Sequence, residues 1–372
     1  MRNPNDSLYN AQQWGLHYIG PLICGYPAGT EFNVQAPALW DSTTGSSTVR
    51  IAIVDSGIDY AHPDLVGRVD EGKSFVGGNQ YWFDDTEKRH GTAVAGIAGA
   101  RTDNSEGIAG LDWTARLVPV KVSDYLNGIP FLSWLTAGIA WTTSAGIPIV
   151  NLSVGTLPNT AQNPDTLTAL SEVCLDAFLS GQLLVAASGN VLSTNGGFDD
   201  AQPLFPSSIT NRVLTVGAIL PDGRRWRDPW IYATPCVGPA PANPCKASNY
   251  GPWLDLMAPG GRFIATTNGG ADGIYYTLAN CNPSSFQTMG FSGTSAAAPV
   301  VSGAAALLKA YRSQLTGDDI EQLLKITALP LGPSEEYGRG LIQLGQALNE
   351  IAPPKSIIRA AFGPSPFSIG SL

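Results

Sequence analysis

The sequence predicts an α/β fold in which helices flank a central, mostly parallel sheet. The first observation is that short apolar runs alternate with longer amphipathic stretches, which is the pattern of βαβ units. The second is that 44% of the 372 residues are hydrophobic, which is enough for a large core. The connections between successive parallel strands are expected to be right-handed.

The expected elements follow in chain order. Strands are expected at the apolar runs Val49–Val54, Leu117–Val122, Ile147–Leu152, Leu183–Ala187 and Val213–Ala218. Helices are expected at Gly91–Ala100, Leu132–Ser144, Leu167–Leu179 and Thr294–Tyr311. Two last helices are expected at Gly317–Thr327, capped by Thr316, and at Gly340–Asn349.

A candidate nucleophile stands at the start of one of these helices. Ser295 opens the stretch Ser295-Ala-Ala-Ala-Pro299, whose small residues let the helix pack closely on neighbouring backbone. A helix N-terminus has unpaired N–H groups and a partial positive charge, so it stabilises an anion that forms there. A serine hydroxyl is a weak nucleophile by itself, and the chain therefore has to supply a base.

Three histidines are available as that base. His90 stands at a second small-residue helix start, which predicts a buried imidazole, whereas His62 and His17 are expected to be structural or solvated. Asp55 ends the first expected strand, at the edge where α/β sheets place catalytic groups. Asp55 is the candidate partner of His90, although an isolated Asp-Ser-Gly is also typical of a turn or a helix cap.

The order Asp55, His90, Ser295 is the order of the triad in subtilisins. The chain resembles the subtilisin family (the subtilases) of serine proteases in four motifs. These are Asp55-Ser-Gly-Ile-Asp59, His90-Gly-Thr, Ala186-Ala-Ser-Gly-Asn190 and Gly293-Thr-Ser295-Ala-Ala-Ala-Pro299. The resemblance covers roughly Leu8 to Leu348 and implies a three-layer subtilisin-like fold. Ala296 and Ala93 stand where the family usually has a methionine and a second histidine, and neither residue transfers protons.

The resemblance implies a serine endopeptidase that works through an acyl-enzyme. Ser295 would attack the scissile carbonyl, His90 would act as general base and then acid, and Asp55 would orient the imidazole. Asn190 and the backbone N–H of Ser295 would donate to the oxyanion. The alternative for Asn190 is a turn residue that follows Gly189.

A peptide substrate is expected to bind as an extended strand, with pockets for alternate side chains. In the family two segments flank the peptide, and here they match Asn151–Gly155 and Tyr125–Ile129. The substrate-binding residues that this implies are Asn127, Gly128, Ser153, Val154, Gly155, Ala187 and Gly189. The pocket walls are apolar, so broad specificity with a bulky apolar residue before the cut is expected. The alternative is that Asn151–Gly155 is only another core strand.

Composition limits the partners and the compartment. A net charge of −9 argues against nucleic acid, and no apolar run reaches the ~20 residues that span a bilayer. Protein or peptide substrates are the expected partners. The five cysteines match no metal-ligand pattern. Cys236 and Cys245 bracket a stiff loop that suits a disulfide and an oxidising compartment. The pairing of Cys24, Cys174 and Cys281 stays open.

Residues 1–46 are expected to pack as an N-terminal segment on a catalytic domain at 47–350, with a tail at 351–372. The first residues lack the apolar core of a signal peptide, and Tyr9–Gly15 resembles the beginning of a mature family domain. The signal and pro-segment that subtilases usually have are therefore expected to be absent from this chain. We expect a secreted or extracytoplasmic enzyme.

The chemistry needs no cofactor, but the resemblance implies one structural calcium ion. Asp64 matches one family ligand, and Asn104 in the loop Asp103–Gly107 resembles a second. The alternative is that this acidic loop is merely solvated. Insertions at 221–248 and 269–289 are expected to be a substrate-guiding rim or surface decoration.

Three other functions stay open. A catalytically silent binding protein of the same fold has no need of a complete triad and Asn190. A sedolisin-like acid protease shares the Ser-Gly-Thr-Ser run but uses Glu and Asp in place of His, so His90 and Asn190 disfavour it. A maturation protease with one dedicated substrate has the same motifs as a broad protease.

Overall fold

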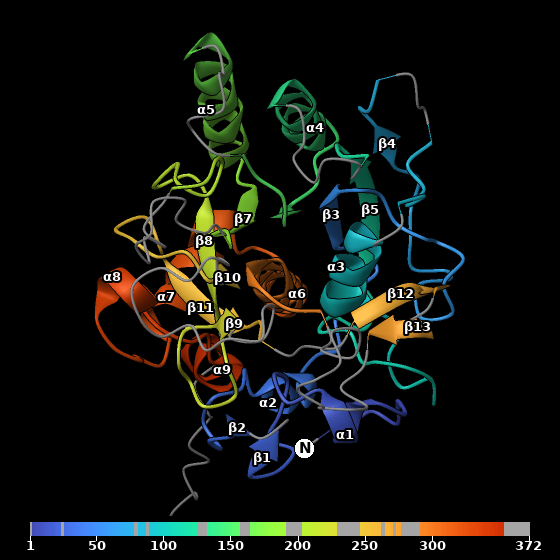
Figure 1. Cartoon of the computed structure of the whole chain (residues 1–372), viewed down its shortest axis with the longest axis vertical. Helices are drawn as coiled ribbons and strands as arrows, with labels where there is room; N and C mark the ends of the chain where they lie inside the picture. The colour runs from blue at the N-terminus through green and yellow to red at the C-terminus, as the bar shows by residue number, and fades with distance from the viewer. Residues whose placement is uncertain are drawn as a thin grey trace, which may run out of the picture.

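A parallel sheet of seven strands forms the centre of the molecule (Figure 1). The computed structural model describes residues 2–23, 26–77, 81–86, 89–124, 132–156, 164–190, 203–228, 246–261, 265–270, 273–276 and 291–352. The strands are β3 Arg50–Asp55, β4 Lys73–Ser74, β5 Arg116–Lys121, β6 Ile149–Leu152, β7 Leu183–Ala187, β8 Leu214–Ile219 and β11 Leu256–Pro259. Their order is β11-β8-β7-β6-β3-β5-β4, and each registered pair is parallel.

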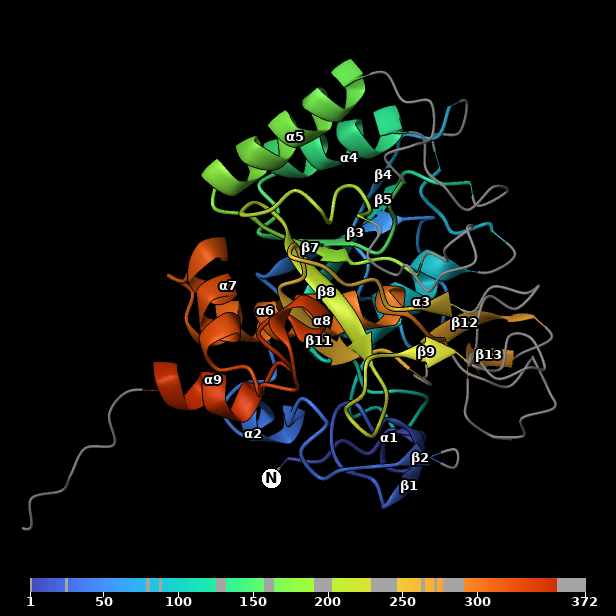
Figure 2. The same ribbon diagram turned by 60° about the vertical axis from the view of Figure 1, so that its left-hand side comes forward.

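Helices cover both faces of this sheet. One face carries α3 (His90–Gly99) and α6 (Thr294–Tyr311), and the other carries α4 (Leu132–Ser144) and α5 (Pro164–Leu179). Successive side chains of a strand point to opposite faces, so Ile51 joins the core with α3 and α6 while Ala52 joins the core with α4 and α5. Figure 2 shows α4 and α5 above the sheet and α6 and α3 below it. The result is the predicted three-layer α/β fold.

Smaller elements surround these layers. The helices are α1 Tyr9–Gln12, α2 Ala36–Trp40, α7 Gly317–Ile326, α8 Ser334–Tyr337 and α9 Leu344–Ile351. The two-stranded sheets are β1 Leu22–Ile23 with β2 Tyr26–Pro27, β9 Arg227–Asp228 with β10 Lys246–Ala247, and β12 Ala265–Gly270 with β13 Gly273–Tyr276. The N-terminal segment lies against the loop after α3, where the Trp40 indole donates to Leu111 O at 2.9 Å.

The five expected strands are present with bounds that differ by at most two residues, and four of the expected helices are equally close. Thr316 caps α7 in a capping box, because its hydroxyl accepts from Asp319 N while the Asp319 carboxylate accepts from Thr316 N. The prediction for the last helix was wrong at its start. Gly340 has φ +110°, and Leu341 pairs with Leu329 as an isolated bridge, so α9 begins only at Leu344.

The strand order has a switch point at β3. The chain runs from β3 to β5 on one side and then returns to β6 on the other side of β3. Such a reversal leaves a gap between connections at the carboxyl ends of the strands, where α/β proteins place their sites. Asp55 is the last residue of β3 and therefore lies at the carboxyl end of the strand at this switch point.

Candidate active site

Asp55 and His90 meet at the carboxyl edge of the sheet. Asp55 is fully buried, and His90, the first residue of α3, is 8% exposed. His90 Nδ1 lies 2.8 Å from Asp55 Oδ1 and 3.0 Å from Oδ2. Because this contact engages Nδ1, the other ring nitrogen, Nε2, points away from the aspartate. This is the orientation in which an imidazole can exchange a proton with a neighbouring hydroxyl.

Glycine allows α3 to approach β3 this closely. A Cβ at Gly91 would lie 2.2 Å from Gly57 O and 3.1 Å from Asp55 Cβ, so a larger residue would have to move backbone. Gly57 itself has φ +107°, a conformation that favours glycine. The Gly91 N–H donates to Ser56 Oγ at 2.9 Å, which ties the helix start to the residue after Asp55. The tight packing was expected from the small residues, whereas the role of Ser56 was missed.

Ser295 lies in the first turn of α6, beside the same edge. Its hydroxyl donates to Ser153 O at 3.2 Å, and the Ser153 hydroxyl donates to Ser295 O at 3.1 Å. These two bonds join the start of α6 to the chain that follows β6. Phe291, just before α6, contacts the His90 imidazole edge-on, with ring centroids 5.2 Å apart. Ser295 is thus bound to the chain after β6 and His90 to the end of β3, and Phe291 connects His90 to the segment just before α6.

Asn190 follows β7 and is held by the residue that precedes Ser295. Its Oδ1 accepts from Thr294 N at 2.9 Å and from Thr294 Oγ1 at 3.0 Å. The Thr294 hydroxyl in turn accepts from Gly189 N at 3.1 Å. A Cβ at Gly293 would lie 2.9 Å from Asn190 Nδ2, so glycine there leaves room for the amide. Because its oxygen is engaged, the amide can present only its NH₂ group to a ligand.

The chain after β6 was predicted to border the substrate, and it follows the sheet edge beside Ser295. Its Thr156 exchanges two backbone hydrogen bonds with Phe205, each 2.9 Å long. A Cβ at Gly155 would meet Leu204 Cδ2 at 2.6 Å and Phe205 O at 2.7 Å, so packing within the chain already requires glycine there. Ser153, Val154 and Ala187 are buried and Gly155 is partly buried. Asn127 and Gly128 lie outside the described residues.

The predicted calcium ligands lie together but do not form a complete cage. Asp64 is fully buried, and it accepts from the Asn104 amide at 3.1 Å and from Ile108 N at 2.9 Å. The Asn104 oxygen accepts from Glu106 N at 2.9 Å, so the amide nitrogen and not the oxygen faces Asp64. Among the described residues, no three His, Cys, Asp or Glu side chains converge on one point.

Asp6 is a further carboxylate near this loop that the sequence interpretation missed. It is 3% exposed, and its Oδ2 accepts from Asp103 N at 2.9 Å, while its Oδ1 is buried without a hydrogen-bond partner. Burial raises the pKa of Asp6 to about 6, and the charge of Asp64 adds to this rise. A buried oxygen without a donor, next to a second carboxylate, is compatible with a cation.

The other histidines do not join the site. His62 is buried, and its Nδ1 accepts from Asp64 N at 3.0 Å, which makes it a structural residue. His17 stacks on Tyr9 with ring centroids 4.0 Å apart, and burial lowers its pKa to about 4. Cys174 is a free, buried cysteine whose thiol pKa is raised to about 12 by burial, so it is no nucleophile. Cys24, Cys236, Cys245 and Cys281, with the loop expected to carry a disulfide, lie outside the described residues.

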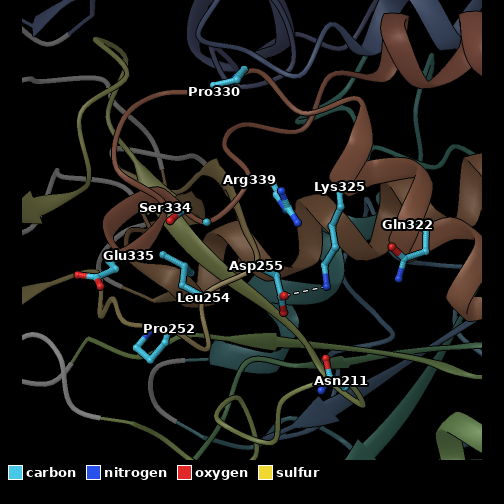
Figure 3. A pocket seen from close by; sticks show the side chains of 11 residues that line it. Asn211, Pro252, Leu254, Asp255, Gln322, Lys325, Pro330, Ser334, Glu335 and Arg339 are labelled. Atoms are coloured by element: carbon cyan, nitrogen blue, oxygen red, sulfur yellow. Dashed lines mark ion pairs between the residues drawn. The ribbon is translucent and has the colours of Figure 1, made fainter.

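A separate pocket of about 840 Å³ lies at the amino ends of the strands, away from the end that carries Asp55 (Figure 3). Asn211 and Asp255, which border it, precede β8 and β11 and so mark the amino ends of the strands. Lys325 reaches Asp255 across it in a 2.7 Å ion pair. None of the predicted catalytic or substrate-binding residues borders this pocket.

Comparison with known proteins identifies the family of the chain. A family model described as the Subtilase family matches residues 46–340. Subtilisin amylosacchariticus from Bacillus subtilis subsp. amylosacchariticus is 34% identical over 315 residues, which cover 84% of this chain and 69% of that protein. The intracellular serine protease of Paenibacillus polymyxa is 32% identical over 328 residues, 86% of this chain and 85% of that one.

A solved protease structure has a similar fold. A protease from Pseudoalteromonas arctica PAMC 21717 superposes with a TM-score of 0.70 and 25% identity, covering 94% of this chain and 99% of that one. The fold and these relatives define the class as serine proteases. The chain belongs to the subtilase family. Within the described residues, none of its helices has the length and apolar character needed to cross a bilayer.

Proposed function

We propose that the chain hydrolyses peptide bonds as a serine endopeptidase, with Ser295 as nucleophile, His90 as general base and acid, and Asp55 orienting the imidazole. One observation carries this assignment: His90 Nδ1 lies 2.8 Å from Asp55 Oδ1 at the edge where α6 begins. A buried pair of charged groups adds little net stability, because taking both groups out of water is costly, so packing alone gives no reason for this pairing.

The reaction would proceed in two halves. Ser295 Oγ forms a bond to the scissile carbonyl carbon while its proton passes to His90 Nε2, and that proton then goes to the amine as the C–N bond breaks. Water then attacks the acyl-enzyme in the same way, giving its proton to His90, and this proton returns to Ser295 as the acyl group leaves. In the structure the Ser295 hydroxyl donates to Ser153 O, so it would turn towards His90 to give up its proton.

The oxyanion would be stabilised by two donors. The first is the Asn190 NH₂ group, whose orientation is supported by the two bonds from Thr294 to Asn190 Oδ1. The second is the Ser295 N–H at the positive end of α6, which has no acceptor among the described residues. Both donors would be in place before charge develops, which is the condition for a large effect in the transition state.

The substrate would lie as an extended strand beside the chain that follows β6. Ser153, Val154 and Gly155 would border it on one side and Asn127 and Gly128 on the other, with Ala187 and Gly189 at the pocket for the residue before the cut. The small, uncharged residues expected to line this pocket support broad specificity with a bulky apolar preference.

The remaining proposals concern stability and compartment. A structural calcium ion would be held near Asp64, with Asn104 turned to offer its oxygen and with the partnerless Asp6 oxygen close by. Secretion and a pro-segment would follow the usual pattern of the family. The intracellular relative from Paenibacillus polymyxa makes an intracellular enzyme the alternative.

The test is cleavage of an unfolded protein and of a mixed peptide library, with products mapped by mass spectrometry. Wild type is expected to cut at many sites, preferentially after bulky apolar residues, and Ser295→Ala to cut none. Cleavage of a single sequence would favour a dedicated maturation protease. No cleavage by a well-folded wild type would overturn the proposal in favour of a silent binding protein.

A further inference from the structure

Helix α3 carries His90 but does not cap its own N-terminus. Its N-cap residue, Arg89, has φ +46° and makes no capping side-chain hydrogen bond. The first N–H groups of a helix have no partner within the helix, so they must be satisfied from elsewhere when they are buried. The residues concerned are Gly91 and Thr92, and both are fully buried.

Two side chains from other segments supply the missing acceptors. Ser56 Oγ accepts from Gly91 N, as described above. Asp84 Oδ2 accepts from Thr92 N at 3.0 Å and from Thr92 Oγ1 at 2.8 Å. The other oxygen, Asp84 Oδ1, accepts from Thr86 Oγ1 at 2.6 Å. Asp84 is fully buried and surrounded by donors, so it acts as a cap borrowed from the loop before the helix.

The Thr92 hydroxyl links this cap to the strand that carries Asp55. It donates to Asp84 and accepts from Asp59 N at 3.0 Å. Asp59 lies four residues after Asp55, in the turn that leaves β3. One hydroxyl group therefore connects the first turn of α3, the buried carboxylate and the turn that follows β3.

The Asp84 loop is itself fixed to the sheet. Asp84 N donates to Ile58 O at 3.3 Å, and Ile58 N donates to Trp82 O at 3.2 Å. The buried Lys121 donates from Nζ to Phe83 O at 2.9 Å and pairs with Asp85. Lys121 ends β5 directly opposite Asp55 in the register of the sheet. The loop is thus anchored at the level of the strand ends where the site lies.

We infer that Asp84 is a positioning residue for the proposed proton transfer: acting through Thr92, it fixes the first turn of α3 and with it the contact between His90 and Asp55. The inference rests on the proposed function, since it assigns Asp84 to the support of His90. Asp84 touches neither substrate nor the reacting atoms. A displacement of about 1 Å in a catalytic group is enough to lower a rate on the order of 100-fold.

The test compares variants of the shared hydroxyl. Thr92→Val removes the hydroxyl with little change in volume, and Thr92→Ser retains it. Asp84→Asn replaces one accepting carboxylate oxygen by an NH₂ group, which would face the hydrogen-bond donors of Thr92 or Thr86. Thr142→Val is the matched control, because the buried Thr142 hydroxyl on α4 makes one hydrogen bond, to Ile139 O, on the other face of the sheet. Active sites are titrated so that kcat refers to folded molecules, well below each melting temperature.

We expect kcat to fall about 10- to 100-fold in Thr92→Val and in Asp84→Asn with KM nearly unchanged, and to recover in Thr92→Ser. Thr142→Val is expected to lower the melting temperature but leave kcat unchanged. Wild-type kcat in both Thr92→Val and Asp84→Asn would overturn the inference. If Asp84→Asn does not fold, the comparison of kcat between Thr92→Val and Thr92→Ser tests the inference alone. An inactive, well-folded wild type would instead count against the proposed function.

Discussion

Thr294 gives two hydrogen bonds to a single atom, the Oδ1 of Asn190, from its backbone N–H at 2.9 Å and from its hydroxyl at 3.0 Å. Thr294, the residue next to the proposed nucleophile, thus binds the oxygen of the Asn190 amide and leaves its NH₂ group available. It follows that the orientation of the proposed oxyanion donor depends on a hydroxyl that has no direct part in the reaction.

Thr294→Val should lower kcat by roughly 10-fold with little change in KM, because the amide loses one of its two anchors but keeps the backbone one. Asn190→Leu should cost about 100- to 1000-fold, a magnitude established in subtilisin and borrowed here. Thr294→Ser keeps the hydroxyl and serves as the control. Equal kcat values for the Val and Ser variants would show that Thr294 does not orient Asn190.

Gly91→Ala should both destabilise the protein and reduce its activity, since the new Cβ would lie 2.2 Å from Gly57 O and push α3 away from β3. The control is Gly77→Ala, where a Cβ would meet only Trp134, at 3.6 Å. Melting temperature and kcat are measured for both. A Gly91→Ala variant with normal kcat would mean that the helix can shift without disturbing the His90–Asp55 pair.

Stability should depend on pH through a buried carboxyl group. Asp112 is fully buried, and burial raises its pKa to about 6. The folded state then holds a proton that the unfolded chain has already lost between about pH 4 and 6, so the free energy of unfolding falls as pH rises through this window.

Asp112→Asn should flatten this pH dependence, by an amount on the order of 2 kcal/mol across the window. Unfolding by urea at pH 4.5 and 6.5 is the measurement, in a Ser295→Ala background that prevents self-digestion. The exposed Asp318→Asn serves as the control. A slope that is the same in Asp112→Asn and wild type would contradict the assignment.

Removal of calcium should lower the melting temperature. A bound ion stabilises the folded state by about 2.7 kcal/mol when its concentration is 100 times Kd. Scans with excess calcium and with a chelator are compared for wild type and Asp64→Asn, again in the inactive background. Unchanged melting of wild type on chelation would remove the calcium proposal.

The enzyme should tolerate mild peroxide. Ala296, directly after Ser295, is buried and has no thioether to oxidise, whereas methionine sulfoxide is a common lesion. Ala296→Met should keep activity before treatment and lose it under peroxide. Rapid loss in wild type would count against this prediction.

The sequence was sufficient for the long apolar elements. β7 and α4 were predicted to the residue, because Leu183–Ala187 is an apolar run between Gln182 and Ser188 and Leu132–Ser144 follows closely after Pro130. β4 was missed because it has only two residues, Lys73 and Ser74, and is defined by its pairing with β5. Short edge strands depend on tertiary contacts that no local pattern contains.

The residues of the proposed triad were predictable because each stands in a recognisable motif. Asp84 was not, because its role depends on contacts with Thr92 and Thr86 that form only when the loop folds back on α3. Thr92 stood within the His90-Gly-Thr motif, yet the motif does not say what its hydroxyl binds. Gly155 was predicted to border the substrate, but no sequence pattern shows that Leu204 and Phe205 already fill the space that a Cβ would take.

The most direct test of the central claim is the intact mass after treatment with a serine-directed fluorophosphonate, for wild type, Ser295→Ala and His90→Ala. A single adduct on wild type, absent from Ser295→Ala and formed far more slowly in His90→Ala, is the predicted result. A well-folded wild type without an adduct, or one that labels equally without His90, would contradict an assembled Asp55–His90–Ser295 triad.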